Sequence, residues 1–428
     1  MAKKGWRSAN LSPDRRVFFG QGRGDVRSRA LAARVTASFG SRGWASTADL
    51  LFPLLFPPTL ISVTPNTGPT AGGTPVDLAG MNFQTGATVT FGGTSATVTL
   101  VTPTHITATT PVHASGAVSV VVTNPDLQSS TLVNGFTYSD PLFVAVTNSG
   151  TVVAISTDAI TWAPQVIASG LWTGIAWNGS IFAAVSSDDK AASSPDGVTW
   201  TSRTIPAGGF STVVWAPELG IFLATGDSNN LASSPDGITW TGHPDLPGNV
   251  VGFCTAWNGL LFSTGGFGSA VFRQGGTSIN GISWTDNFMP GTGNRYNAMI
   301  YAGSRFVAVS SGPARAATSP DGSTWTAQTI TVNSGWRGLA YNGSRIVAVG
   351  IGSGVNDNVA TSDDGGVTWI SRSLPSVPGS GLAAVAWNGQ VFAALAFTGT
   401  AGYSSSDGIT WVQRVVPNAG YAAIAVKS

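Results

Sequence analysis

The chain contains few charged residues. Only 41 of its 428 residues are Lys, Arg, Asp or Glu, including a single Glu, Glu218, and two Lys before residue 190. Exposed helix faces are normally filled by these residue types, so their scarcity argues against a helical protein. A hydrophobic fraction of 42% is too high for a disordered chain. The composition therefore predicts an all-β fold, with 55 Gly and 24 Pro to supply its turns.

Cysteine, histidine and long apolar runs are also scarce. The lone Cys254 has no internal disulfide partner, and its apolar surroundings predict a small core residue rather than a nucleophile. The three histidines are isolated from one another, so we predict no metal site and no cofactor. The best apolar stretch, Leu50–Ile61, is broken by three prolines, and we expect no membrane insertion. Residues 8–42 hold no apolar segment typical of a secretory signal.

The few charges are distributed unevenly. Residues 1–57 hold ten basic and three acidic residues, a net charge of +7, whereas residues 58–428 hold 11 and 17, a net charge of −6. We therefore predict a basic N-terminal arm that docks on a protein assembly. The arm has no base-reading motif and few aromatic residues, so we do not expect a nucleic-acid partner. Its candidate anchoring residues are Arg7, Arg15, Arg16, Arg23, Arg27, Arg29, Arg34 and Arg42.

Residues 58–140 have the pattern of a small β-sandwich, with short alternating runs separated by Gly, Pro and Asn turns. Pro65–Pro69, followed by Gly72–Thr74, Gly80–Phe83 and Phe136–Tyr138, resembles the IPT/TIG immunoglobulin-like family over the whole segment. The segment contains no Lys or Arg, so it cannot neutralise phosphates and is predicted to be a spacer or stalk. Four aromatic residues are expected to fill the core between its two sheets: Phe83, Phe91, Phe136 and Tyr138.

From residue 141 the sequence repeats. A motif of the form Ser-Pro-Asp-Gly-x-Thr-Trp recurs every 38 to 44 residues. Its seven copies end at Trp162, Trp200, Trp240, Trp284, Trp325, Trp369 and Trp411. This period is the length of a four-stranded propeller blade, so residues 141–428 are predicted to form a seven-bladed β-propeller. Because the first blade begins with its second strand, Leu142–Val146, the last strand, Tyr421–Val426, is expected to complete it and close the ring.

The repeated motif resembles the Asp-box (BNR) repeat of sialidase-like propellers, Ser-x-Asp-x-Gly-x-Thr-Trp. Residues 362–369 match that spacing in full, while Ala159 replaces Gly in the first copy and Asn280 replaces Asp in the fourth. In that family the box is structural and lies on the face away from the active site, so the resemblance implies that these departures matter little. The turns are also expected to leave Arg305 and Arg345 solvated.

The sequence contains few of the residues that a glycosidase needs for catalysis. A sialidase needs an arginine triad, a Tyr/Glu nucleophile pair and an acid/base. The propeller segment holds one Glu, Glu218, in a predicted turn between strands, and no arginine motif precedes the first blade. We therefore predict that the protein is not an enzyme, with a sialidase-like glycoside hydrolase as an alternative.

Aromatic residues mark the start of several inner strands, five residues before the aromatic that closes each of them. These starting ends surround the central channel of a propeller on the face opposite the motif turns. Two interpretations remain open: a hydrophobic plug that closes the channel, or a stacking platform for sugars. The candidate platform residues are Trp172, Phe210, Phe253, Tyr296, Trp336 and Tyr421.

The domain organisation predicted is a basic arm over residues 1–57, an immunoglobulin-like stalk over 58–140 and a propeller head over 141–428. This architecture resembles that of bacteriophage virion components such as fibre, spike or decoration proteins. We expect a structural or adhesion role on the virion surface, with other virion proteins as partners of the arm and a host-surface glycan as ligand of the head. The arrangement also allows a homo-oligomer. A bacterial cell-surface adhesin is the main alternative.

Overall fold

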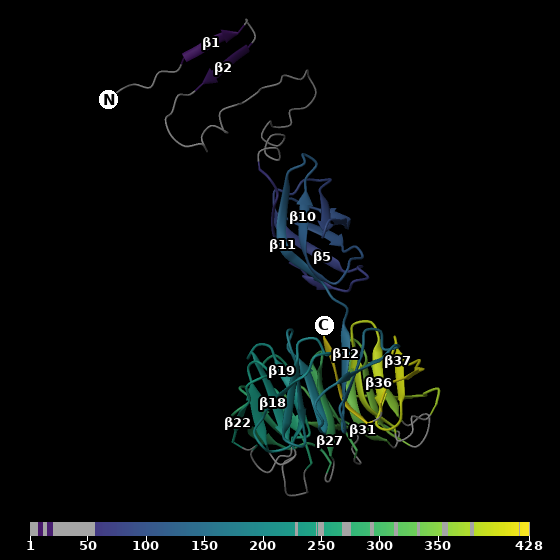
Figure 1. Ribbon diagram of the computed structural model, residues 1–428. Helices are drawn as coiled ribbons and strands as arrows, with labels where there is room; N and C mark the ends of the chain where they lie inside the picture. The colour runs from purple at the N-terminus through teal and green to yellow at the C-terminus, as the bar shows by residue number, and fades with distance from the viewer. Residues whose placement is uncertain are drawn as a thin grey trace, which may run out of the picture. The chain divides into compact units, whose positions relative to one another are not determined.

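The computed structural model describes residues 7–11, 15–19, 56–226, 230–244, 246, 252–267, 275–291, 295–311, 316–331, 334–352, 358–376, 381–418 and 420–427, with side chains from residue 56 onward. Every regular element in these ranges is a β-strand, which confirms the all-β prediction. No described segment forms a helix that could cross a membrane. The chain divides into two compact units, residues 1–138 and 139–428 (Figure 1).

The first unit contains a two-stranded ribbon and a two-sheet sandwich. In the ribbon, β1 (Arg7–Leu11) pairs antiparallel with β2 (Arg15–Phe19). The sandwich sheets have the strand orders β3-β5-β9-β8 and β4-β11-β10-β6-β7. Their strands are β3 (Thr59–Thr64), β4 (Thr67–Gly68), β5 (Pro75–Met81), β6 (Thr88–Phe91), β7 (Thr94–Ser95), β8 (Thr97–Val101), β9 (His105–Thr109), β10 (Gly116–Thr123) and β11 (Ser129–Tyr138).

The sandwich core contains the four aromatic residues expected from the sequence. Phe91, Phe136 and Tyr138 have no exposed surface, and Phe83 is 4% exposed. The Phe91 and Phe136 rings meet edge to face with their centroids 5.2 Å apart. The longest strand of the sandwich is β11, which has ten residues and is buried mainly at its C-terminal end.

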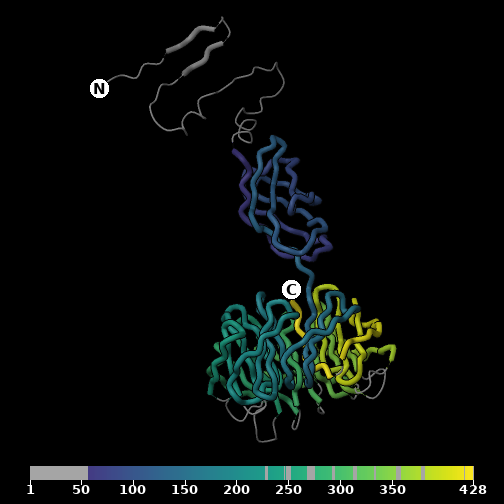
Figure 2. The backbone as a smooth tube through the Cα atoms, viewed as in Figure 1, coloured from purple at the N-terminus to yellow at the C-terminus, as the bar shows by residue number. Residues whose placement is uncertain are grey.

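The second unit is a propeller of seven four-stranded sheets within the described residues, which confirms the predicted fold (Figures 1 and 2). Blade 1 contains β12 (Leu142–Thr147), β13 (Val152–Ser156), β14 (Ala163–Val166) and β39 (Tyr421–Lys427). Blade 2 contains β15 (Trp172–Trp177), β16 (Phe182–Ser186), β17 (Lys190–Ser194) and β18 (Thr201–Thr204). Blade 3 contains β19 (Phe210–Ala216), β20 (Ile221–Gly226), β21 (Leu231–Ser234) and β22 (Thr241–His243).

The other four blades follow the same order, with the innermost strand first. Blade 4 contains β23 (Cys254–Trp257), β24 (Phe262–Gly265), β25 (Gly275–Ser278) and β26 (Thr285–Asn287). Blade 5 contains β27 (Tyr296–Ala302), β28 (Arg305–Ser310), β29 (Ala316–Ser319) and β30 (Thr326–Gln328). Blade 6 contains β31 (Gly335–Tyr341), β32 (Ile346–Ile351), β33 (Val359–Ser362) and β34 (Ile370–Arg372). Blade 7 contains β35 (Leu382–Trp387), β36 (Phe392–Ala396), β37 (Ala401–Ser405) and β38 (Val412–Val415).

The C-terminal strand closes the ring. Strand β39 pairs antiparallel with β12, from Leu142 opposite Lys427 to Thr147 opposite Tyr421, as the sequence predicted. The yellow end of the tube in Figure 2 therefore lies beside the blue strand that enters the propeller. Each inner strand contacts the inner strand of the next blade, and β39 contacts both β15 and β35. Closure ties the two ends of the unit together through backbone hydrogen bonds.

Four blades are filled by aromatic residues at the same places. In blade 2 the Phe182 ring, which begins the second strand, lies between Trp177 at 4.5 Å and Trp200 at 6.4 Å between centroids. The same order of Trp, Phe and Trp recurs in blades 3, 4 and 7. The tryptophan that ends each repeated motif thus packs within its own blade, where large rings bury much apolar surface.

Candidate functional site

The two ends of the propeller are built differently. One end, here called the turn end, carries the Ser-x-Asp turns between third and fourth strands and the turns between first and second strands. The other, here called the bulge end, is where the inner strands begin. Lys427, the last residue that the structure describes, belongs to the turn end, since its ammonium lies 5.2 Å from the ring centroid of Trp177, where β15 ends.

At the turn end, each carboxylate of the repeated motif accepts hydrogen bonds from residues of its own turn. In blade 2, Asp196 Oδ1 accepts hydrogen bonds from Ser194 Oγ at 3.0 Å, Val198 N at 2.8 Å and Thr199 N at 2.7 Å. The Gly197 N–H donates to Ser194 Oγ at 2.8 Å. Such bonds satisfy backbone N–H groups that have no partner strand within a tight turn.

The two departures from the motif keep this geometry. Asn280 Oδ1 accepts from Ile282 N and Ser283 N, both at 2.9 Å, as Asp196 accepts from Val198 N and Thr199 N in blade 2. Ala159 adopts the left-handed conformation of the usual glycine, with φ of 59°, and packs against Ala393 of blade 7. The expectation that these changes matter little to the fold is confirmed.

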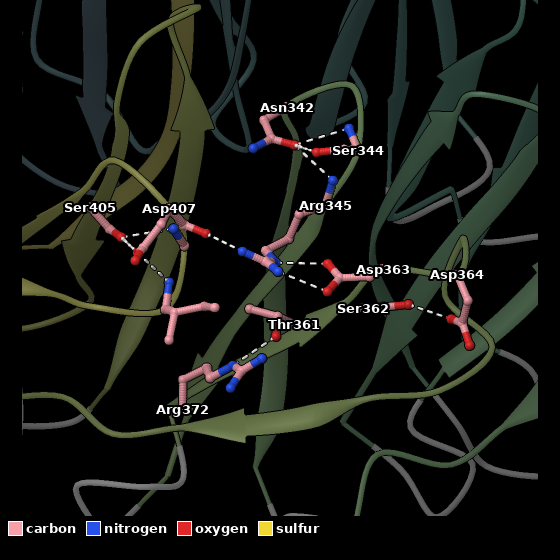
Figure 3. A network of polar contacts seen from close by, with 12 residues as sticks. Asn342, Ser344, Arg345, Thr361, Ser362, Asp363, Asp364, Arg372, Ser405 and Asp407 are labelled. Carbon is pink, nitrogen blue, oxygen red and sulfur yellow. Dashed lines mark hydrogen bonds and ion pairs between the residues drawn. The ribbon is translucent and has the colours of Figure 1, made fainter.

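One arginine predicted to be solvated is instead an interblade clamp (Figure 3). Arg345 donates from Nε and Nη2 to the two carboxylate oxygens of Asp363, each at 2.7 Å, and from Nη1 to the Asp407 carbonyl in blade 7 at 2.7 Å. Its side chain is only 22% exposed. The hydrogen bond from Arg345 and its positive charge lower the pKa of Asp363. The two parallel hydrogen bonds to Asp363 explain why the Arg345 side chain is fixed against the protein and not solvated.

Two residues weighed as chemical groups have structural roles. Glu218 lies in the exposed turn between β19 and β20, as predicted, and accepts a hydrogen bond from Trp257 Nε1 at 2.6 Å. Cys254 is 3% exposed, and burial raises the pKa of its thiol to about 12, which confirms a packing role. Among residues with described side chains, no group of three or more His, Cys, Asp or Glu is placed to hold a metal ion.

The predicted aromatic platform is mostly core. Trp172, Tyr296, Trp336 and Tyr421 have no exposed surface, and Phe210 is 1% exposed. Each ring packs against the preceding blade, as Trp172 does against Val144 and Val153 of blade 1. These five side chains therefore offer no accessible face to a ligand, and they lie between blades rather than plugging a channel. Phe253 differs from them, since it is only partly buried.

A β-bulge explains why the sequence pattern selected buried aromatic residues as an accessible platform. The pairing between first and second strands shifts by one residue after Trp172, Phe210, Tyr296, Trp336 and Leu382. Strand β39 has the same shift after Tyr421. A bulge inserts one unpaired residue, so alternation counted back from the end of the strand fails beyond it. The residue that the bulge leaves unpaired, and not the aromatic before it, is the more accessible one.

The six unpaired positions and the equivalent residue of blade 4, where strand pairing begins at Cys254, form what we call the bulge ring. Blade 4 contributes Phe253, which lies four residues before Trp257 as the others do before their own inner-strand residue. The members of the bulge ring are Thr173, Ser211, Phe253, Asn297, Arg337, Ala383 and Ala422.

Bulge-ring side chains reach toward the next blade. Thr173 Oγ1 donates to the Phe210 carbonyl at 2.5 Å, and Asn297 Nδ2 donates to the Trp336 carbonyl at 2.8 Å. Both acceptors are backbone groups at the start of the neighbouring inner strand. The seven positions differ in chemistry from blade to blade, in contrast to the repeated turn end.

Arginine and phenylalanine pair on one side of the bulge end. The Arg295 guanidinium carbon lies 3.8 Å from the ring centroid of Phe253, and that of Arg337 lies 4.7 Å from the centroid of Phe397. Both arginines are exposed, Phe397 is half-buried, and Phe267, which forms a backbone bridge with Arg295, is 49% exposed. The four side chains of the two pairs come from blades 4 to 7.

The two arginines influence each other. Nearby protein removes water from Arg337, and the Arg295 guanidinium adds repulsion, so the pKa of Arg337 is lowered from its ordinary value. Among the described side chains, no carboxylate lies within ion-pair distance of Arg337. The acids of blade 2 at this end are engaged elsewhere: Asp188 pairs with Lys190 at 2.5 Å, and Asp189 accepts from Gly208 N at 2.7 Å.

Sequence reasoning missed these arginines, although the signal lay next to the residues it chose. Arg337 directly follows Trp336, and Arg295 directly precedes Tyr296. The predicted anchoring residues are only partly placed. Arg7, Arg15 and Arg16 lie in β1 and β2, where the backbone alone is described. The other anchoring arginines, Arg23, Arg27, Arg29, Arg34 and Arg42, lie outside the described residues.

Comparison with known proteins identifies the family of the sandwich. Residues 58–139 match the family model of the IPT/TIG domain. The predicted resemblance of this segment is therefore confirmed. No curated protein matches the chain in sequence.

Three solved structures that are similar to the chain illustrate its likeness to known β-propellers. A streptogramin B lyase structure matches with a TM-score of 0.51 and 11% identity, over 66% of this chain and 91% of that one. Virginiamycin B lyase from Staphylococcus aureus matches with a TM-score of 0.48 and 12% identity, over 57% and 84%. YCF48 bound to D1 peptide matches with a TM-score of 0.44 and 14% identity, over 66% and 96%. At 11% identity, the match to the streptogramin B lyase structure shows a shared fold and nothing of activity.

Proposed function

We propose that the protein is a non-enzymatic binding protein whose propeller binds a glycan at the bulge end. The observation that carries the proposal is the group of accessible aromatic rings there, Phe253, Phe267 and Phe397, beside two exposed arginines. Sugar sites combine flat apolar surfaces with a few polar groups that fix orientation. At the turn end, by contrast, the rings and carboxylates are occupied by the fold itself.

The chemistry of the described bulge end favours binding over catalysis. General acid–base hydrolysis of a glycoside needs two carboxyl groups flanking the bond. Asp188 and Asp189 are the acids described near the starts of inner strands, and both are held by hydrogen bonds to backbone N–H groups of their own blade or the next. The only Glu, Glu218, lies at the turn end.

The setting we propose is the surface of a bacteriophage virion, as a fibre, spike or decoration protein. The basic arm would dock on other virion proteins, the IPT/TIG domain would act as a spacer, and the propeller would contact the host. The net charge of +7 over residues 1–57 supports the docking role, because it contrasts with −6 over the rest of the chain.

Binding is tested with the full-length protein on an array of bacterial-surface glycans, with mass spectrometry of each bound glycan to detect cleavage. We expect retention of specific glycans without products. Phe267→Ala should weaken retention, whereas Ile160→Ala, which removes a similarly exposed side chain (48% against 49%) at the turn end, should not. Cleavage products, or equal effects of the two substitutions, would contradict the proposal.

The setting is tested by deleting residues 1–57 and by immunogold electron microscopy of the source particles. Full-length protein should label the particle surface, and the truncated protein should fail to assemble while its propeller melts at an unchanged temperature. Assembly of the truncated protein would refute the anchoring role of the arm.

A further inference from the structure

A groove lies between blades 2 and 3 of the propeller. Its volume of about 540 Å³ is within the range of about 300–1,000 Å³ typical of ligand sites. One wall is formed by residues 202–206, which include the last three residues of β18, and the other by residues 238–240 in blade 3. We propose that this groove binds an extended acidic peptide of a partner protein, which pairs with the free edge of β18 and is held by Arg203.

The proposed site is separate from the glycan site at the bulge end. The groove contains no residue of the bulge ring and none of the exposed phenylalanines. The peptide proposal therefore stands or fails independently of the glycan-binding function.

The backbone of β18 carries the first part of the argument. Strand β18 pairs with β17 on one side and is the last strand of its sheet, so its other edge is not paired with a strand (Figure 1). Successive side chains of a strand point to opposite faces, so a wall of five consecutive residues, 202–206, follows the edge of the chain. An extended peptide adds to such an edge as a further strand, because its N–H and C=O groups alternate at the same spacing. A sugar chain lacks this alternation.

The charge of the groove indicates what the peptide carries. Arg203 supplies the one charged side chain in the lining. Its Nε donates to Ser193 Oγ at 2.8 Å, which fixes the guanidinium, while its two Nη atoms have no hydrogen-bond partner among the described residues. A guanidinium held in this way offers two donors in a plane to a carboxylate. The groove therefore complements an Asp or Glu side chain.

Trp240 adds a buried donor without an acceptor to the groove wall. The motif tryptophans of blades 2, 4, 5, 6 and 7 donate from Nε1 to a glycine carbonyl of their own turn, as Trp200 does to Gly197 at 3.0 Å. Trp240 is 8% exposed, and its Nε1 has no hydrogen-bond partner. An unsatisfied buried donor is costly, so an acceptor that a bound peptide brings to Trp240 would add to affinity.

The rest of the lining suits the neighbours of the acidic residue. Ile205 is buried, Pro206 is half-buried and Ile238 is 39% exposed, so together they offer an apolar surface. In an extended peptide, residues on either side of the carboxylate point to the opposite face. We therefore expect apolar or hydroxylated residues to flank the Asp or Glu.

The probe is an array of heptapeptides, acetylated and amidated at their ends, with a central Asp between varied apolar and hydroxylated residues. Each peptide is printed beside the same sequence with a central Asn. Full-length protein should bind at least one Asp peptide about tenfold or more tightly than its Asn partner, since hydrogen bonds to charged groups are the stronger class. The bound peptide should also slow hydrogen exchange at residues 202–206.

Gln is the informative replacement for Arg203. Gln328 occupies the same strand position in blade 5 and donates to Thr318 Oγ1 at 3.1 Å. Arg203→Gln therefore retains a cross-strand donor without the charge, and it should abolish the preference for Asp at an unchanged melting temperature. Arg414→Gln in blade 7 is the matched control and should keep the preference, since Arg414 Nε donates to Ser404 Oγ at 2.9 Å.

Pairing with the strand edge is tested on the peptide itself. Two versions of the best Asp peptide carry N-methyl groups on one or the other set of alternate backbone nitrogens. Only one set faces β18 in a paired strand, so one version should lose binding and the other should keep it.

The outcomes that overturn the proposal differ in what they remove. Equal binding of Asp and Asn partners, or an unchanged preference in Arg203→Gln, overturns the assigned site. Full binding of both N-methylated versions overturns strand pairing. Failure to bind any peptide overturns the proposal as a whole, and tighter binding of inorganic polyphosphate than of every Asp peptide overturns the choice of ligand.

Discussion

The residues at the two ends of the propeller are repeated from blade to blade to different degrees. At the turn end, the repeated turns make closely similar hydrogen bonds, even where Asn280 or Ala159 departs from the motif. At the bulge end, the seven bulge-ring positions hold Thr, Ser, Phe, Asn, Arg and Ala. A site that every blade needs for folding is repeated, whereas a site that binds one ligand has no reason to be. The difference supports the proposal that the turn end serves stability and the bulge end serves recognition.

The sharpest contrast lies between two adjacent residues of β31. Trp336 has no exposed surface and packs against Val307 and Val309 of blade 5, so Trp336→Ala is expected to cost about 3–5 kcal/mol. Arg337→Ala should change the free energy of unfolding by less than about 0.5 kcal/mol, because its side chain is exposed. Urea unfolding followed by tryptophan fluorescence reports mainly on the propeller, since residues 139–428 hold 13 of the 15 Trp and residues 58–138 hold none.

Similar costs for the two substitutions would mean that Arg337 also holds the blades together. In that case the bulge end could not be described as a binding surface separate from the core.

A second comparison exchanges Gly and Ala within the repeated turn. A methyl group on Gly197 would meet Val144 Cγ2 at 2.8 Å, and its φ is 78°, so Gly197→Ala should cost about 1–3 kcal/mol. Ala159→Gly should shift stability by less than about 1 kcal/mol, because relief of the left-handed backbone is offset by the lost contact with Ala393. Thermal melting of both variants measures the difference. A large loss in Ala159→Gly would show that blade 1 uses the methyl group for closure.

A third comparison, with the smallest effect at neutral pH, sets Asp against Asn in the turns. Burial opposes ionisation of Asp321, but hydrogen bonds from the backbone of Thr324 and Ser323 and from two hydroxyls lower its pKa to about 2. A carboxyl whose pKa falls on folding stabilises the fold above its unfolded pKa of about 4 and loses that contribution as pH drops toward 2.

Melting temperature should therefore be steady above about pH 4 and should decline toward pH 2. Asp321→Asn should be tolerated at pH 7, as Asn280 is in blade 4, and should make the acid decline shallower. An unchanged decline in Asp321→Asn would show that other groups govern acid unfolding.

Much of the fold could be predicted because it repeats. The period of the tryptophans gave the number of blades, and the incomplete first blade gave the closure by β39, since a free strand edge must be paired. Phe83, Phe91, Phe136 and Tyr138 were found as core because large aromatic side chains between turns are rarely left exposed.

The site could not be predicted from the same patterns. The bulge before Gly338 inverts the alternation of β31, so counting along the sequence selected Trp336 and passed over Arg337. Arg345 was expected in water, because its partners Asp363 and Asp407 come from later turns that only the closed ring brings together. Local sequence shows which residues are unusual, but contacts between blades decide what they do.

The most direct test of this division compares two arginines of blade 6 at opposite ends. The dissociation constant for a glycan that the array retains and the melting temperature are measured for Arg337→Ala and Arg345→Ala in the full-length protein. Arg337→Ala should weaken binding about tenfold or more at an unchanged melting temperature. Arg345→Ala should lower the melting temperature, by loss of the bonds to Asp363 and Asp407, and leave binding unchanged. The opposite pattern, with binding lost only in Arg345→Ala, would contradict the assignment of recognition to the bulge end.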